Sequence, residues 1–146
     1  MRSRGFTLIE LLVALAIMAI ISAVAVPIYT QYSIRTQRTN AEKDLMNCAQ
    51  SMERLNAQTF TYAGKVGPGA DTGAVTANIC TPTSTGMYTI TVTVANANTF
   101  TLRATPVAGS VVASNGLLEI DATGATRWDR NNDGDFGDAN ETSWTH

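Results

Sequence analysis

Residues 4–13 read Arg4-Gly5-Phe6-Thr7-Leu8-Ile9-Glu10-Leu11-Leu12-Val13, and this stretch joins a short basic leader to a long apolar segment. Residues 11–26 are apolar with one exception, Ser22. Residues 6–28 would form a helix about 34 Å long, enough to cross a hydrocarbon layer of about 30 Å. The chain therefore begins with a candidate membrane-spanning helix.

A secretory signal peptide is the simplest alternative for this segment, but two features speak against it. The apolar part is longer than the roughly 7–15 residues of a signal peptide's hydrophobic region. It also carries a carboxylate, Glu10. A charge at the centre of a membrane helix costs roughly 2.5–3.5 kcal/mol on insertion scales, and less near an end. Such a group indicates a function and predicts a cationic partner.

The stretch at residues 4–13 resembles the class III signal of type IV prepilins and pseudopilins. The resemblance implies that a prepilin peptidase cuts between Gly5 and Phe6 and that Phe6 is then N-methylated. Pro27 falls where many pilins carry a helix-kinking proline. The resemblance lies in the sequence itself at residues 4–13. Beyond these residues it extends only to the expected arrangement of helix and strands.

Removal of the leader would give Glu10 a natural partner. The new amine on Phe6 stays cationic when methylated, and we expect the Glu10 carboxylate to pair with the Phe6 amine of a neighbouring subunit. A buried ion pair is weak evidence that the assembly is stabilised, but it is good evidence that the two helices are held at a fixed axial offset. Arg2 and Arg4 precede the apolar segment, which predicts a single-pass inner-membrane precursor with its C-terminus outside the cytoplasm, and then a cell-surface pilus.

The helical pattern continues beyond the apolar segment. Between Tyr29 and Ala57, apolar residues recur at steps of three, four and seven, which is typical of one face of a helix. They are Ile34, Ala41, Leu45, Cys48, Met52 and Leu55. We predict one helix from Phe6 to the high fifties, kinked at Pro27. Residues 1–5 would be the leader, 6–28 the transmembrane or filament-core half, and 29–146 a globular domain.

The two cysteines of the chain, Cys48 and Cys80, both fall on the exported side. Residues 60–87 are rich in glycine and proline and predict an irregular loop. An oxidising compartment favours one disulfide between the two cysteines, which would tie this loop to the helix. The chain-entropy model sets its contribution at no more than about 3–4 kcal/mol.

Two segments alternate between apolar and polar residues as strands do, residues 88–94 and 100–105, and residues 117–121 predict a third strand after Asn115-Gly116. Their short connections predict an antiparallel meander within residues 88–122, with one face on the helix. The expected fold class is α+β, a long N-terminal α-helix packed on a three- to four-stranded antiparallel β-sheet. The resemblance to type IV pilins implies the same architecture.

Oxygen-bearing side chains gather in the C-terminal tail, residues 129–146. The candidate calcium ligands are Asp129, Asn131, Asp133, Asp135, Asp138 and Glu141. The first three, with Gly134, match positions 1, 3, 5 and 6 of a calcium-binding loop. Position 12 is Asn140, so the closing carboxylate comes one residue late. Two interpretations remain open: a calcium loop that secures the tail, and a solvated acidic turn.

Composition narrows the function. The 146 residues are 15% charged, against about 25% in an average soluble domain, and the formal net charge is −2. This balance gives no strong nucleic-acid signature and argues against a basic nucleic-acid-binding module. One histidine, His146, and two cysteines offer little to an active site, and we predict that the protein is not an enzyme.

The expected function is that of a structural subunit of a type IV pilus serving adhesion, twitching motility or DNA uptake. The resemblance implies other pilin subunits, the prepilin peptidase and an inner-membrane assembly platform as partners. Two alternatives stay open. One is a pseudopilin of a type II secretion system, and the other is a membrane-anchored binding protein that does not polymerise.

Overall fold

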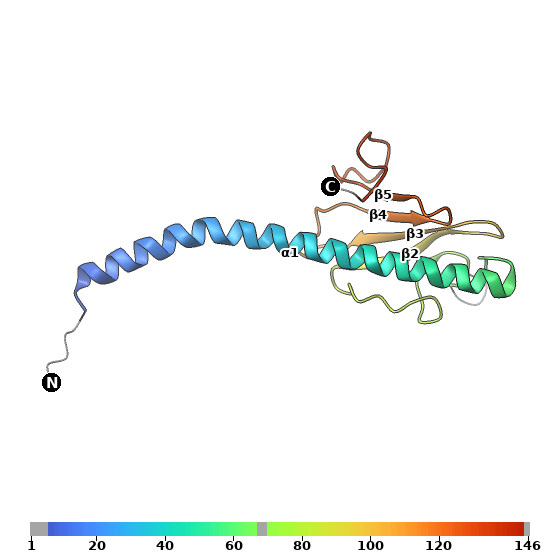
Figure 1. Ribbon diagram of the computed structural model, residues 1–146, viewed down its shortest axis with the longest axis horizontal. Helices are drawn as coiled ribbons and strands as arrows, with labels where there is room; N and C mark the ends of the chain where they lie inside the picture. The colour runs from blue at the N-terminus through green and yellow to red at the C-terminus, as the bar shows by residue number, and fades with distance from the viewer. Residues whose placement is uncertain (1–5, 67–69, 145–146) are drawn as a thin grey trace. The chain divides into compact units, whose positions relative to one another are not determined.

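A computed structural model describes residues 6–66 and 70–144. The chain divides into two units, the first ending at Ser33 and the second beginning at Ile34. Helix α1, Leu8–Thr59, contributes to both units (Figure 1). Gly5 and the rest of the leader lie outside the described residues, as do the last two residues of the tail.

The second unit contains a five-stranded antiparallel sheet. Its strands are β1 (Gly73–Ala74), β2 (Tyr88–Ala95), β3 (Phe100–Pro106), β4 (Leu118–Asp121) and β5 (Thr126–Trp128). Strands that follow one another in the sequence are neighbours in the sheet, so the predicted meander is confirmed.

The sequence did not predict β1 and β5. These strands are two and three residues long, too short to show an alternating pattern. β1 lies inside the segment expected to be an irregular loop, and β5 follows the tight turn after β4. The sheet therefore has five strands, where three or four were expected.

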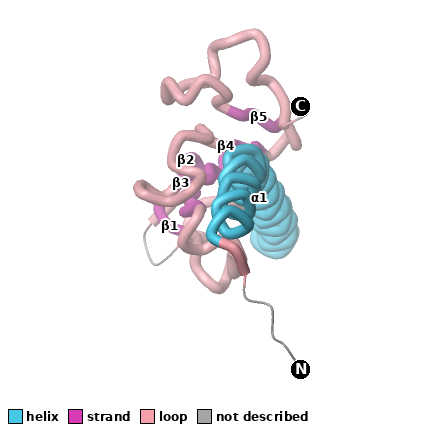
Figure 2. The backbone as a smooth tube through the Cα atoms, turned by 90° about the vertical axis from the view of Figure 1, so that its left-hand side faces the viewer, coloured by secondary structure: helices cyan, strands magenta, loops and turns pink. Residues whose placement is uncertain are grey.

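One face of α1 packs on one face of the sheet to form the core, and Figure 2 shows α1 beside the strands. On the helix, Ala41, Leu45, Cys48 and Met52 are fully buried, which confirms the predicted apolar face. The sheet supplies the inward-pointing residues of its strands, among them Ile90, Val92, Phe100, Leu102 and Leu118. Threonines occupy the alternate, outward positions of β2, as the period of two requires.

A polar network joins α1 to the sheet near β5. The guanidinium of Arg38, on α1, lies 3.9 Å from the centre of the Trp128 ring. It also donates from Nη1 to Oδ1 of Asn115 at 3.3 Å. Trp128 donates from Nε1 to the Asn115 carbonyl at 2.7 Å, and Asn115 Nδ2 donates to the Tyr88 hydroxyl at 2.6 Å. This network fixes β5, from which the acidic tail begins.

Candidate functional site

Glu10 and Thr7 form a capping box at the start of α1. Thr7 precedes the first helical residue, and its amide and its hydroxyl donate to Glu10 Oε2 at 2.8 and 2.7 Å. The Glu10 amide in turn donates to the Thr7 hydroxyl at 3.3 Å. This reciprocal arrangement satisfies two of the amides that a helix leaves without partners at its N-terminus.

The capping box sets where the helix begins relative to the predicted processing site. Because the helix starts at Leu8, Phe6 lies before it, with 89% of its side chain exposed. The Glu10 carboxylate already accepts hydrogen bonds within its own chain, so it has donors before assembly. Its pairing with a neighbour's Phe6 amine stays a prediction.

Glu10 is set among apolar side chains. It shares a stripe of α1 with Ile9, Val13, Ala14 and Ile17, which line a shallow depression of about 300 Å³. The Glu10 carboxylate is the one charged group in this apolar stripe, so it distinguishes one position along the helix axis. A neighbouring helix that carried a cation would be held at that position.

The N-terminal half of α1 is long and apolar enough to cross a membrane. Its large apolar side chains are exposed in the single chain, from Leu8 at 79% to Ile28 at 63%. Apolar surface on this scale requires a partner, either lipid or other helices.

Pro27 lies within α1, which is assigned as helix on both sides of it. Proline has no amide hydrogen, so the helix loses one hydrogen bond there. Three residues further on, the Thr30 hydroxyl donates to the carbonyl of Val26 at 3.0 Å. The turn that ends at Pro27 therefore has one backbone hydrogen bond fewer than an uninterrupted helix.

Two anchors on one face of α1 hold the loop that precedes β2. Cys48 and Cys80 are joined in a disulfide, with their Cα atoms 5.1 Å apart. One turn earlier, the buried Asp44 carboxylate accepts hydrogen bonds from the amides of Thr83 and Ser84, at 2.9 and 2.8 Å. Burial alone would raise the pKa of Asp44, but the hydrogen bonds from Ser84 and Thr83 outweigh it and lower the pKa below its ordinary value.

The acidic tail folds into a tight loop around Asp129. The side chain of Asp129 is fully buried and accepts from the amides of Asp133 and Gly134, both at 3.1 Å. The Asn131 Nδ2 group donates to a carboxylate oxygen of Asp133 at 2.8 Å and to one of Asp138 at 2.7 Å. Four of the predicted ligand residues are thus brought together by hydrogen bonds. Among the described residues, no three His, Cys, Asp or Glu side chains form a group that could hold a metal.

The two remaining predicted ligands have different surroundings. The buried Glu141 carboxylate accepts from the amides of Arg130 and Asp138, at 3.1 and 3.3 Å, and so closes the loop. Asp135 is exposed and accepts from the amide of Gly137 at 2.7 Å.

The tail is also fixed to the sheet. Glu119 on β4 is buried between Arg103, whose Nη2 lies 2.6 Å from Glu119 Oε1, and Arg127. The Phe136 ring from the tail lies 5.8 and 5.9 Å from these two guanidinium groups. Beyond the loop, Trp144 donates from Nε1 to the Arg127 carbonyl at 2.9 Å. These contacts secure the tail without a terminal disulfide.

Sequence reasoning missed Thr7 and Asp44. The first had a signal, because Thr7-Leu-Ile-Glu10 is the T-x-x-E pattern of a capping box before an apolar run. Asp44 had none, since its partners lie about forty residues away along the chain.

Two family models together match most of the chain. Residues 1–26 match the prokaryotic N-terminal methylation motif. Residues 27–115, more than half of the chain, match a model described as the type IV minor pilin ComP, DNA uptake sequence receptor.

Curated relatives match over a short stretch of the chain. A fimbrial protein of Pseudomonas aeruginosa is 48% identical over 42 residues, which is 29% of this chain and 27% of that protein. The type IV major pilin protein PilA of Myxococcus xanthus is 41% identical over 44 residues, 30% of this chain and 20% of that protein. The matched stretch therefore spans only a fifth to about a quarter of these relatives.

A solved structure shares the fold. The crystal structure of the non-core minor pilin PilV of Neisseria meningitidis aligns with a TM-score of 0.53 at 18% identity. The alignment covers 73% of this chain and 96% of that chain.

Proposed function

Because the chain belongs to the type IV pilin family, we propose that it is a structural subunit of a type IV pilus. A prepilin peptidase removes the leader between Gly5 and Phe6, Phe6 is methylated, and the subunits polymerise into a surface filament. The observation that carries this proposal is the presence, in one chain, of the methylation motif and of a domain that matches a pilin model.

The two environments of the subunit follow from the exposed half of α1. Before assembly, lipid of the inner membrane covers these side chains, and Arg2 and Arg4 hold the leader in the cytoplasm. During assembly on an inner-membrane platform, neighbouring helices replace the lipid. Glu10 then exchanges its Thr7 donors for the Phe6 amine of a neighbour, which fixes the axial offset between the two helices.

The match of residues 27–115 to a pilin model supports a pilus over the two alternatives, a secretion pseudopilin and an anchored binding protein. The description of that model also names a receptor for DNA uptake sequences. Arg103 and Arg127 on the sheet are engaged with Glu119 and Asp121, and the net charge is −2. Neither feature favours DNA as a ligand of this chain.

Filaments sheared from the cell surface test the proposal. Electron microscopy with an antibody to this chain should show label along the filaments, and a strain that lacks the gene should lose the label. A chain that stays in the membrane fraction while the filaments remain unlabelled would favour one of the two alternatives.

We also propose that the acidic tail binds Ca²⁺. Asp129 accepts from the amides at positions 5 and 6 of the matched pattern, so the backbone already follows the turn that such a loop needs. The Asn131 amide group lies between the carboxylates of Asp133 and Asp138 and donates to both. A cation at that place would neutralise the two negative charges, which a neutral amide group does not.

Thermal unfolding of the full chain in detergent micelles, followed by the fluorescence of Trp128 and Trp144, tests calcium binding. Added Ca²⁺ should raise the Tm, because binding stabilises the folded state by about 2.7 kcal/mol at a hundredfold excess over Kd. The Asp133→Ala variant should lose this response. A Tm that is the same with Ca²⁺ and with chelator would mean that the tail is held by its own hydrogen bonds and does not bind calcium.

A further inference from the structure

An apolar groove lies in the second unit, where α1 meets the β4 side of the sheet. It has a volume of about 190 Å³. Met46, Ala49 and Gln50 line it from α1, Phe100 and Ile120 line it from the sheet, and Ala122 lines it from the turn after β4. Met46 is 49% exposed, so an apolar side chain borders the groove on its open side.

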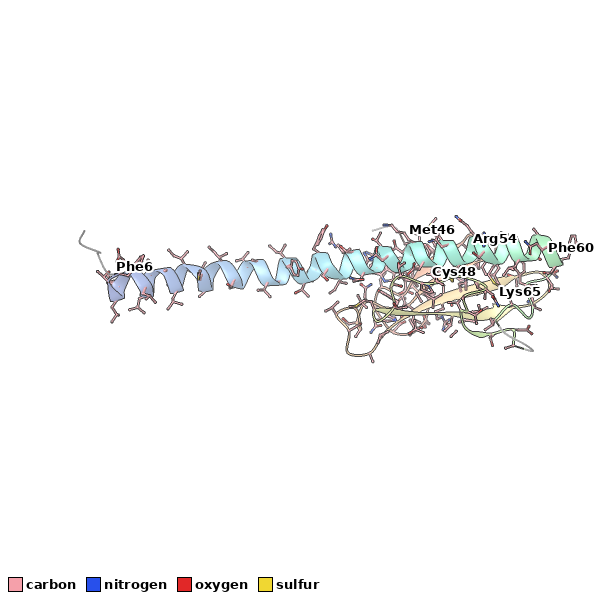
Figure 3. All side chains as sticks on the ribbon, turned by 90° about the horizontal axis from the view of Figure 1, so that it is seen from below. Phe6, Met46, Cys48, Arg54, Phe60 and Lys65 are labelled. Carbon is pink, nitrogen blue, oxygen red and sulfur yellow. A yellow bond between two sulfur atoms is a disulfide. The ribbon has the colours of Figure 1, made fainter. Side chains whose placement is uncertain are left out.

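Phe60, directly after the last residue of α1, has a conformation and an exposure that folding does not explain. Its φ is +55°, a left-handed conformation that usually belongs to glycine at this position and is unfavourable for a residue with a Cβ. Its amide donates to the Asn56 carbonyl at 2.7 Å and closes the helix, which glycine would do equally well. Its side chain is 87% exposed and projects from the end of α1 (Figure 3).

The charges around the groove and around Phe60 are of opposite sign. Glu53 and Asp121 are among the residues that line the groove. Within the chain, the Glu53 carboxylate accepts from the Tyr62 hydroxyl, and Asp121 pairs with Arg127 at 3.3 Å. Lys65 places its ammonium group 2.6 Å from the hydroxyl of Thr59, the residue before Phe60. An aromatic ring next to a cation thus matches an apolar groove next to two carboxylates.

We propose that, in the filament, Phe60 of one copy inserts into this groove of the next copy. The proposal rests on the pilus role and deepens it by naming a contact between subunits. α1 rises about 1.5 Å per residue, so Phe60 lies about 10–20 Å beyond the groove residues along the axis, and two parallel copies in contact are displaced by that amount. The ring and the groove are different surfaces of one chain, so the contact repeats from copy to copy and builds a polymer.

A photo-crosslinking amino acid tests the contact in intact filaments. Benzoylphenylalanine at position 60 keeps an aromatic ring there, and irradiated filaments should yield crosslinks to Met46 or to the other groove residues of a second copy. The matched control places the same group at Val111, which is also exposed and apolar. A crosslink from position 60 to another filament protein or to another surface of this chain would overturn the contact, as would no crosslink in filaments that contain the label.

The Phe60→Gly variant separates assembly from folding. Glycine suits the left-handed backbone, so resistance to unfolding should be equal or higher, while the amount of chain in sheared filaments should fall severalfold. The Phe60→Tyr variant keeps an aromatic ring and should be found in sheared filaments in the wild-type amount. Normal incorporation of Phe60→Gly would contradict the contact alone, whereas absence of the wild-type chain from filaments would contradict the pilus role and this contact with it.

Discussion

Glu10 has two roles that substitution can separate. In the single chain its carboxylate caps the helix with Thr7. In the filament we expect the same group to carry the charge that pairs with a neighbour's Phe6 amine. Glutamine can replace glutamate in a capping box but carries no charge. Thr7→Val removes the cap and leaves the charge.

We predict that Glu10→Gln preserves the start of α1 but lowers incorporation into filaments. A charge-assisted hydrogen bond contributes about 1.5–3 kcal/mol, so incorporation should fall about tenfold or more. Quantitative immunoblots of sheared filaments measure it. Amide hydrogen exchange of the full chain in micelles should show a normal first turn in Glu10→Gln and a frayed one in Thr7→Val. Wild-type levels of Glu10→Gln in filaments would remove the ion pair from the account.

Gly116 is required where the chain before β4 lies beside Asp129, the first residue of the tail. Its φ is +75°, and a Cβ there would overlap the carbonyl oxygen of Asp129. Gly109 has a similar φ of +79° with nothing within 4 Å of a Cβ. Alanine at either position costs about 1–2 kcal/mol for the left-handed backbone, and crowding adds about 1–3 kcal/mol at Gly116 alone.

Denaturant unfolding of the full chain, followed by tryptophan fluorescence, should therefore show Gly116→Ala to be less stable than Gly109→Ala by about 1–3 kcal/mol. Equal losses in the two variants would mean that the tail does not pass Gly116 as closely as described.

At the scale of elements, α1 organises the second unit through one face. Asp44 and Cys48, a turn apart, fix two points of the same loop, Cys80 and the amides at Thr83 and Ser84. The loop also buries Ile79 in the core, and together with these anchors this contact fixes its path toward β2.

The Asp44 anchor should be sensitive to acid. The folded-state pKa of Asp44 lies below its ordinary value, so its stabilising contribution is fully present above the unfolded-state pKa of about 3.9 and is lost as the pH falls through the folded-state pKa. As the pH falls from 5 to below the folded-state pKa of Asp44, the free energy of unfolding should decrease more in the wild type than in Asp44→Asn. Denaturant titrations at several pH values measure the difference, and parallel curves for the two proteins would contradict it.

Elements with a repeating pattern were predictable from the sequence, and those held by distant contacts were not. The face of α1 and strands β2 and β3 carry clear periods, and the structure confirms them. β4 is confirmed as a strand, but its polar residue Glu119 is buried. β1 and β5 pair through hydrogen bonds to longer neighbours, which two or three residues cannot reveal. The groove has no local signal either, because Phe100 and Ile120 meet α1 only in the folded chain.

At the scale of the whole molecule, the two units differ in what covers their apolar residues. The first unit leaves its apolar side chains exposed, so it depends on lipid or on other subunits. The second unit buries a core of its own between α1 and the sheet. Membership of the type IV pilin family explains both, since a pilin is stored in a membrane and then packed into a filament.

The mass of the intact chain taken from sheared surface filaments shows whether the protein is a processed pilus subunit. We predict a chain that begins at Phe6 and carries one methyl group on its terminal amine. A chain that retains residues 1–5, or one that was cut within residues 14–25 as an ordinary signal peptide would be, would contradict it.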